Sequence, residues 1–153
     1  MREIGCMLLL AICIFAAGCG NVFSEMEYNS DEKIAGQADR FAKQDSMFNP
    51  VDGGYELTMG EFNGRETLWA LDAEESCDIQ ISFTLSLTAG KVKLVHIDAE
   101  GNVTTLLECT PETTIEEAVD MTIGLSSGEN RLKIVGFGCE NVHMVMLSDD
   151  ISW

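Results

Sequence analysis

The residues of this chain that are best suited to chemistry are six cysteines and two histidines. A cysteine beside a histidine can act as a nucleophile, and paired cysteines can bind zinc. However, no two cysteines have C-x-x-C spacing, and nothing in the sequence places His96 or His143 beside a cysteine. The sequence also lacks the G-x-S-x-G, H-E-x-x-H and Walker A motifs. We therefore predict that the protein is not an enzyme, and an enzyme that uses His96 or His143 is the distant alternative.

The N-terminus has the features of an export signal. Residues 4–17 are almost continuously apolar, which is too short a run for a bilayer-spanning helix of about 20 residues. The run matches the apolar region of a secretory signal. The stretch 15–19, FAAGC, resembles the lipobox of bacterial lipoproteins. This resemblance implies that residues 1–18 are removed and that Cys19 is acylated, for example with palmitate. The protein would then be anchored to the cell membrane at its extracytoplasmic face, whereas an ordinary signal peptide is the alternative.

Three cysteines remain in the mature chain: Cys77, Cys109 and Cys139. An odd number cannot form a closed set of disulfides, so at most one pair can be bridged. Free cysteines mostly behave as small buried apolar residues. We expect all three to be reduced, although the sequence leaves a disulfide between two of them open.

The charge of the chain excludes several classes of partner. It has 26 acidic and 9 basic residues and a formal net charge of −17 at pH 7. Phosphate backbones and anionic headgroups are bound by Lys and Arg, so neither nucleic acid nor an anionic lipid surface is expected as a partner. A hydrophobic fraction of 46% is typical of a globular domain and not of a disordered acidic tail.

The pattern of the mature chain predicts strands. The twelve residues from Cys77 to Thr88 alternate apolar and polar with a period of two. Seven further short strands are expected at 55–59, 67–71, 91–98, 103–108, 118–125, 131–137 and 142–147. Eight short strands separated by turn residues predict an all-β fold, an antiparallel β-sandwich. The order of these elements is similar to that of the jelly-roll modules of bacterial surface proteins.

The stretch 19–52 differs from this β-domain and is predicted to be a tether. Ile34, Ala38 and Phe41 recur at helical spacing, as in a short amphipathic helix over 31–44 with Ser30 as its N-cap. The sequence NPVDGG then marks a boundary. The predicted domains are a signal peptide at 1–18, the tether at 19–52 and the β-sandwich at 53–153.

The predicted strands at 91–97 and 131–137 share an unusual pattern. Each begins with two basic residues on one face and continues with apolar residues on that same face. We therefore expect basic side chains at one end of an outer sheet face and an apolar patch at the other. Either the 31–44 helix covers this patch, or the patch binds a ligand or partner. The predicted patch consists of Val95, Ile97, Val135, Phe137 and Val145.

The acidic clusters of the chain do not match a metal-binding loop. They lie at residues 72–75, 98–100 and 149–150, and none has the spacing of an EF-hand. We expect solvated turn residues and no cofactor. A structural calcium ion held by Asp72 or Asp98 is the alternative, since jelly-roll modules often carry one.

Aromatic residues decide whether a sugar site is expected. Sugar rings stack on exposed aromatic faces, and the candidates are Tyr55, Trp69 and Trp153, with Phe62 behind them. Trp69 falls on the apolar face of its strand, so the supply of exposed rings is thin. We therefore predict a membrane-anchored, non-catalytic module that binds an unknown protein or glycan. A carbohydrate-binding module is the alternative.

Overall fold

The computed structural model describes residues 25–151. A helical turn at 25–28 precedes helix α2. The other elements follow in the order α2 (Asp31–Ala35), β1 (Arg40–Gln44), β2 (Met47–Val51), β3 (Gly54–Ala73), β4 (Cys77–Ser86), β5 (Ala89–Ile97), β6 (Val103–Cys109), β7 (Ile115–Leu125) and β8 (Gly128–Leu147). No helix within the described range is long and apolar enough to cross a membrane. The predicted signal peptide and Cys19 lie outside that range.

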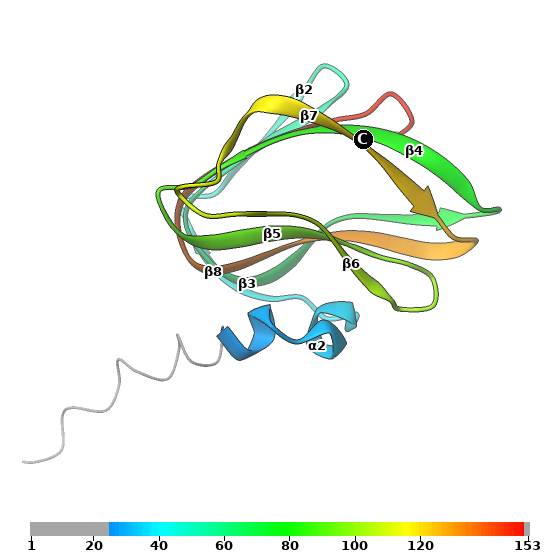
Figure 1. Ribbon diagram of the computed structural model, residues 1–153, viewed down its shortest axis with the longest axis horizontal. Helices are drawn as coiled ribbons and strands as arrows, with labels where there is room; N and C mark the ends of the chain where they lie inside the picture. The colour runs from blue at the N-terminus through cyan, green and yellow to red at the C-terminus, as the bar shows by residue number, and fades with distance from the viewer. Residues whose placement is uncertain (1–24, 152–153) are drawn as a thin grey trace, which may run out of the picture.

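The strands form one antiparallel sheet that folds over on itself into two layers, as Figure 1 shows. The long strands β3 and β8 run through both layers. In the first layer, which we call sheet I, the order is β1, the second half of β3, the first half of β8, β5 and β6. In the second, sheet II, the order is β2, the first half of β3, the second half of β8, β4 and β7. The predicted all-β, antiparallel sandwich is confirmed.

The line along which the sheet folds over is marked by unusual backbone conformations. Asp45, between β1 and β2, and Asn141, in β8, both have a φ of 50°, and Gly90 in β5 has a φ of 80°. The apolar alternation also shifts by one residue here, because Met59 and Phe62 are both buried in β3. This shift keeps apolar side chains pointing inward after the strands turn into the other layer.

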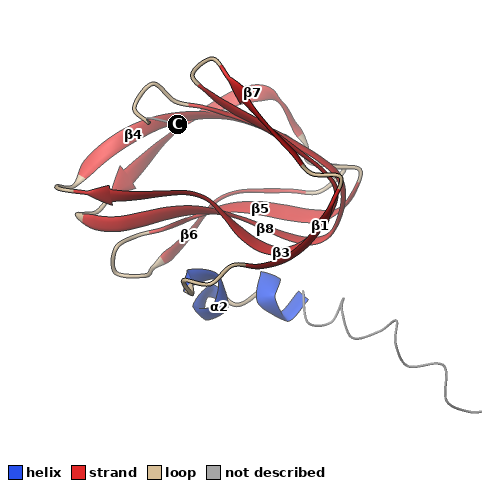
Figure 2. Ribbon diagram, turned by 180° about the vertical axis from the view of Figure 1, so that it is seen from behind, coloured by secondary structure: helices blue, strands red, loops and turns tan. Residues whose placement is uncertain are grey.

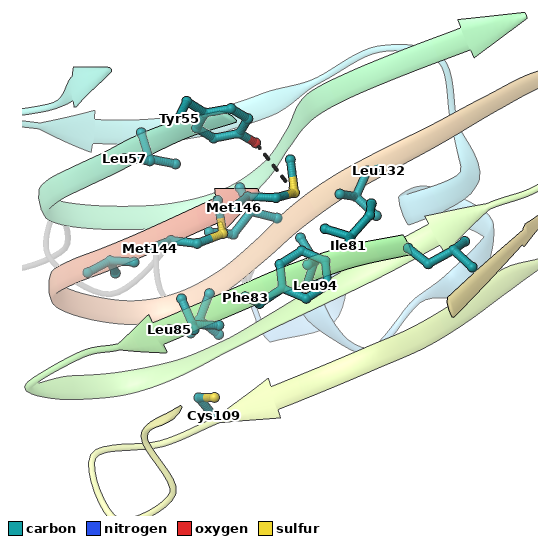
Figure 3. Close-up of a cluster of buried hydrophobic side chains, with 14 of the residues drawn as sticks. Tyr55, Leu57, Ile81, Phe83, Leu85, Leu94, Cys109, Leu132, Met144 and Met146 are labelled. Atoms are coloured by element: carbon teal, nitrogen blue, oxygen red, sulfur yellow. Dashed lines mark hydrogen bonds between the residues drawn. The ribbon is translucent and has the colours of Figure 1, made fainter. Parts of the chain in front are cut away.

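The core between the layers is apolar. Tyr55 and Leu57 of β3 face Met144 and Met146 of β8, and Ile81, Phe83 and Leu85 of β4 complete this part, as seen in Figure 3. Met59 of β3 belongs to the same cluster. Most of these side chains are no more than 1% exposed. Burial on this scale is the main force that holds the two layers together.

The strand pattern differs from the sequence prediction in two places. The predicted strands 55–59 and 67–71 are the two halves of β3, and those at 131–137 and 142–147 are the two halves of β8. The polar residues between the halves lie in the bend and not in a turn. The number of strands is still eight, because β1 and β2 were not predicted.

The prediction that 19–52 is only a tether was therefore wrong for residues 40–51. Residues 47–51 pair with 54–58 in the first half of β3, and residues 40–44 pair with 61–65 further along, so both segments lie at the edge of the sheet. The helix predicted over 31–44 is also shorter than expected. It starts at the Ser30 cap, whose Oγ accepts from Lys33 N at 3.4 Å, but it ends at Ala35. Pairing with β3 gives residues 40–44 sheet hydrogen bonds that a helix would exclude.

Candidate functional site

The outer face of sheet I carries the basic and apolar residues that the sequence analysis singled out. In the antiparallel register of β5 with β8, Lys91 lies opposite Phe137 and Lys93 opposite Val135. Further along, Val95 lies opposite Lys133 and Ile97 opposite Arg131. The expected separation into a basic end and an apolar end was wrong, because antiparallel pairing sets the basic start of one strand beside the apolar end of the other.

The N-terminal segment 25–39, which we call the strap, covers this face. Figure 2 shows its helical parts lying against the layer that contains β3, β5, β6 and β8. Tyr28 and Ile34 of the strap are 2% and 0% exposed and pack with Val95, Ile97 and Val135, each of which is 0% exposed. The strap thus supplies the cover that the apolar residues require.

Polar contacts fix the strap to the cations beneath it. Glu27 forms an ion pair with Arg65 at 3.0 Å, and Asp39 forms one with Lys133 at 3.1 Å. The carbonyl groups of Ala35 and Gly36 accept hydrogen bonds from Arg131 at 2.7 and 3.0 Å. Gly36 O also accepts from Lys133 at 2.8 Å.

The aromatic ring of Tyr28 adds a second kind of contact. The Nζ atoms of Lys91 and Lys93 lie 4.5 and 4.7 Å from the ring centroid, within cation–π range. The Tyr28 hydroxyl donates to Glu108 at 2.5 Å. Burial, together with Glu108, raises the pKa of Tyr28, so the phenol stays neutral.

Of the five residues predicted as a ligand or partner patch, three are therefore beneath the strap. Phe137 is partly exposed and lies 5.7 Å from the Lys91 ammonium. Val145 is partly exposed and belongs to sheet II, where it pairs with Glu56 and Thr84. The structure does not bring the five together as one exposed surface.

The histidines lie apart from each other and make structural contacts. His96 is 6% exposed and its Nε2 lies 3.1 Å from Asn130 Oδ1. His143, on the outer face of sheet II, lies 2.7 Å from Glu56 Oε1. A hydrogen bond from His143 lowers the pKa of Glu56.

The three cysteines within the described range are free: Cys77 is exposed, whereas Cys109 and Cys139 are buried. Burial raises the pKa of Cys139 to about 11, which suppresses the nucleophilic thiolate. Its Sγ donates to Lys91 O at 3.0 Å. The environments of Cys109 and Cys139 are typical of structural cysteines.

The acidic residues considered for calcium do not gather in the described part of the chain, where no three His, Cys, Asp or Glu side chains are placed to hold one ion. Asp98 instead caps its own turn, accepting from Asn102 N and Nδ2 at 2.8 Å each. The side-chain bond from Asn102 lowers the pKa of Asp98.

The aromatic residues predicted for sugar binding are mostly inaccessible. Tyr55 and Phe62 are 1% and 0% exposed, and Trp69 is partly buried against the core. Trp153 lies outside the described residues. Among residues 25–151, the exposed rings are instead Phe41 of β1 and Phe48 of β2, at 41% and 59%.

Phe41 borders an open hollow of about 350 Å³ at the edge of sheet I. Its lining combines this apolar ring with amide, carboxylate and ammonium groups, from Phe41, Ala42, Lys43, Gln44, Glu61 and Asn63. Strands β1 and β3 build it together, since Ala42 pairs with Asn63 and Gln44 with Glu61. Four of its six lining residues are polar or charged, so the hollow offers hydrogen-bonding groups together with a small apolar surface.

Two contacts hold the hollow in shape. Lys43 Nζ lies 4.8 Å from the centroid of the Phe41 ring and is itself fixed by Glu66 Oε1 at 2.5 Å. Asn63 Oδ1 accepts from Gly138 N at 2.6 Å, which leaves the Asn63 Nδ2 group to donate elsewhere. The ring and the amide are therefore preorganised.

Comparisons with known proteins add little beyond the fold. No family model matches the chain, and no curated protein matches it. Similar solved structures include TmCBM61 in complex with β-1,4-galactotriose, at 12% identity and a TM-score of 0.46, covering 74% of this chain and 90% of that one.

Two other carbohydrate-binding modules give weaker matches. One, from Cellvibrio mixtus lichenase 5A in complex with cellotriose, has 12% identity and a TM-score of 0.39, covering 71% of this chain and 88% of that one. The other, CBM35 from Paenibacillus barcinonensis, has 18% identity and a TM-score of 0.39, covering 71% and 91%. With TM-scores below 0.5, these likenesses carry no argument about ligands.

Proposed function

We propose that this protein is a non-catalytic, glycan-binding module that is anchored to the extracytoplasmic face of the membrane through acylated Cys19. The observation that carries the binding proposal is the open hollow beside β1, which the exposed Phe41 borders and which Lys43, Gln44, Glu61 and Asn63 also line. The anchor rests on the sequence of residues 15–19.

The chemistry of the hollow suits a sugar. The C–H face of a pyranose ring can lie against the exposed part of Phe41, as apolar groups do on aromatic faces. Sugar hydroxyls both donate and accept hydrogen bonds. Gln44 and Asn63 offer amide donors and acceptors, and Glu61 offers a carboxylate acceptor. The hollow is open to solvent, as binding to a polymer chain requires.

The test is a titration of residues 20–153, which contain all of the described fold. The probes are β-1,4-linked trimers of glucose, galactose and N-acetylglucosamine, followed by NMR of the backbone amides. We expect shifts centred on Phe41, Gln44 and Asn63 for at least one trimer. Phe41→Ala should weaken that binding at least tenfold, because it removes the stacking surface.

Phe48→Ala is the matched control, since it removes an exposed ring from the neighbouring strand β2. It should leave the affinity within about twofold. No shift with any trimer, or equal loss in both variants, would contradict a glycan site at this hollow. If none of the trimers causes a shift, a protein partner is favoured, which cross-linking in intact cells would identify.

A further inference from the structure

The strap determines where the chain leaves the domain. Glu27 is 3% exposed in its ion pair with Arg65, and Tyr28 is 2% exposed against the outer face of sheet I. The described chain begins at Glu25, only six residues after Cys19. The linker between the proposed anchor and the strap is thus far shorter than the tether that the sequence suggested over 19–52.

The length of this linker limits the distance between anchor and domain. Six residues of fully extended chain span at most about 20 Å. The strap itself cannot add to this reach while Glu27, Tyr28 and Ile34 remain buried in the domain. A lipid on Cys19 therefore holds the strap within about 20 Å of the membrane.

We propose that the strap and the adjoining rim of sheet I form the membrane-facing surface of the anchored protein, and that the outer face of sheet II points away. This inference rests on the acylated anchor proposed above. It also deepens the binding proposal. A smaller hollow of about 160 Å³ shares the lining residues Phe41, Ala42 and Asn63 with the Phe41 site, and it is also lined by Glu27 of the strap and Arg40. The ligand class that fits this position is a glycan at the surface of the same membrane.

The exposed residues of the strap indicate whether the protein surface itself can bind the membrane. Glu25, Asp31 and Glu32 are exposed carboxylates, which anionic headgroups repel. Within residues 25–39, Met26 is the one large apolar side chain that is exposed, at 59%, and a single methionine gives little membrane affinity. The acyl chains, and not the protein surface, must therefore provide the attachment.

The orientation can be measured on the acylated full chain in phosphatidylcholine vesicles that contain a lipid with a gadolinium chelate on its headgroup. The readout is the paramagnetic broadening of methyl resonances. Ala38, an exposed residue of the strap, should broaden at least threefold more than Val145 on the outer face of sheet II. Equal broadening of both methyl groups would overturn the proposed orientation.

Two control chains separate the possible failures. A 30-residue Gly-Ser insertion after Val22 gives a linker with an average span of about 30 Å, and it should abolish the difference between Ala38 and Val145. Cys19→Ser should show no broadening at all. If the wild-type chain carries no lipid by mass spectrometry, the anchor is wrong. If it carries lipid but shows no preference, the anchor stands and the orientation is wrong.

Discussion

The outer face of sheet I is buried beneath the strap, whereas the outer face of sheet II is open to solvent. On β5 the outward positions hold Lys91, Lys93, Val95 and Ile97. On β4 the outward positions hold short polar residues, Gln80, Ser82, Thr84 and Ser86, all at least partly exposed. Gln80 exchanges hydrogen bonds with Thr122 of β7 at 2.8 and 3.0 Å.

This difference shows why only one face needs a cover. Short hydroxyl and amide side chains satisfy one another and water, so sheet II can face solvent on one side. On sheet I, aliphatic side chains alternate with long cations whose alkyl stems are also apolar. The strap buries the aliphatic groups, its carboxylates form ion pairs with the cations, and its backbone carbonyl groups accept hydrogen bonds from them. The covered face therefore contributes stability, and the open face should contribute little.

The largest expected effect comes from placing a charge on each face. Val95→Asp would bury a carboxylate at a position that is 0% exposed beneath the strap. We expect it to lower the free energy of unfolding by about 3 kcal/mol or more, because a buried carboxylate is costly and Lys133, which lies opposite, is already engaged by Asp39 and Gly36 O. Val145→Asp, the same change on the open face, should cost less than about 1 kcal/mol.

Urea denaturation of residues 20–153 followed by tryptophan fluorescence measures both variants. Equal losses would show that the strap does not shield sheet I in solution. A folded Val95→Asp protein with normal stability would mean the same, and would reopen the patch as a binding surface.

A smaller effect is expected from the ion pairs of the two faces. Asp39→Asn removes the carboxylate partner of Lys133, whose side chain is 0% exposed and keeps only its hydrogen bond to Gly36 O, and the change should cost about 1–3 kcal/mol. Adding Lys133→Met should recover most of this loss, because the uncompensated buried cation is then gone. His143→Gln, which breaks the exposed pair with Glu56 on sheet II, should change stability by less than about 0.5 kcal/mol.

The recovery in the double variant is the decisive part of this measurement. If Asp39→Asn and the double variant are equally unstable, Asp39 acts through its hydrogen bonds to Thr67 and not through Lys133. If His143→Gln costs as much as Asp39→Asn, the contrast between the two faces is wrong.

The fold could be predicted from sequence because alternation within a strand is a local property. The run from Cys77 to Thr88 shows its period of two without any knowledge of its neighbours, and it became β4. The relation between strands is not local. The basic residues of 91–97 and 131–137 were expected at one end of a face, but the antiparallel register places Lys91 beside Phe137.

The candidate site was harder to predict, because it lies on short edge strands. Phe41 was assigned to the apolar side of a helix over 31–44, and it is instead an exposed ring on β1. A signal for the neighbouring strand was present in the sequence. Asp52 and Gly53 form the two-residue turn between Val51 and Gly54, and an Asp-Gly pair is typical of a β-hairpin. Reading it as a hairpin would have placed β2 at 47–51.

The smallest effect concerns the pH dependence of stability. Burial raises the pKa of Asp39, but hydrogen bonds from Thr67 and Lys133 outweigh it and bring this pKa below its ordinary value of 3.8. A carboxyl whose pKa is lower in the folded state contributes stability above its unfolded pKa and loses it as the pH falls through the folded pKa. The difference in free energy of unfolding between the wild type and Asp39→Asn should therefore shrink as the pH falls below about 4.

Urea denaturation at pH 7, 5, 4 and 3 measures this difference, with Glu56→Gln on sheet II as the control. The pKa of Glu56 is also lowered, by His143, but that pair is solvent-exposed and its contribution is screened. The difference in free energy of unfolding between the wild type and Glu56→Gln should thus be small at every pH. If the difference in stability between wild type and Asp39→Asn stays constant down to pH 3, Asp39 is not held as a carboxylate by the face beneath the strap, and its ion pair with Lys133 does not help to fix the strap.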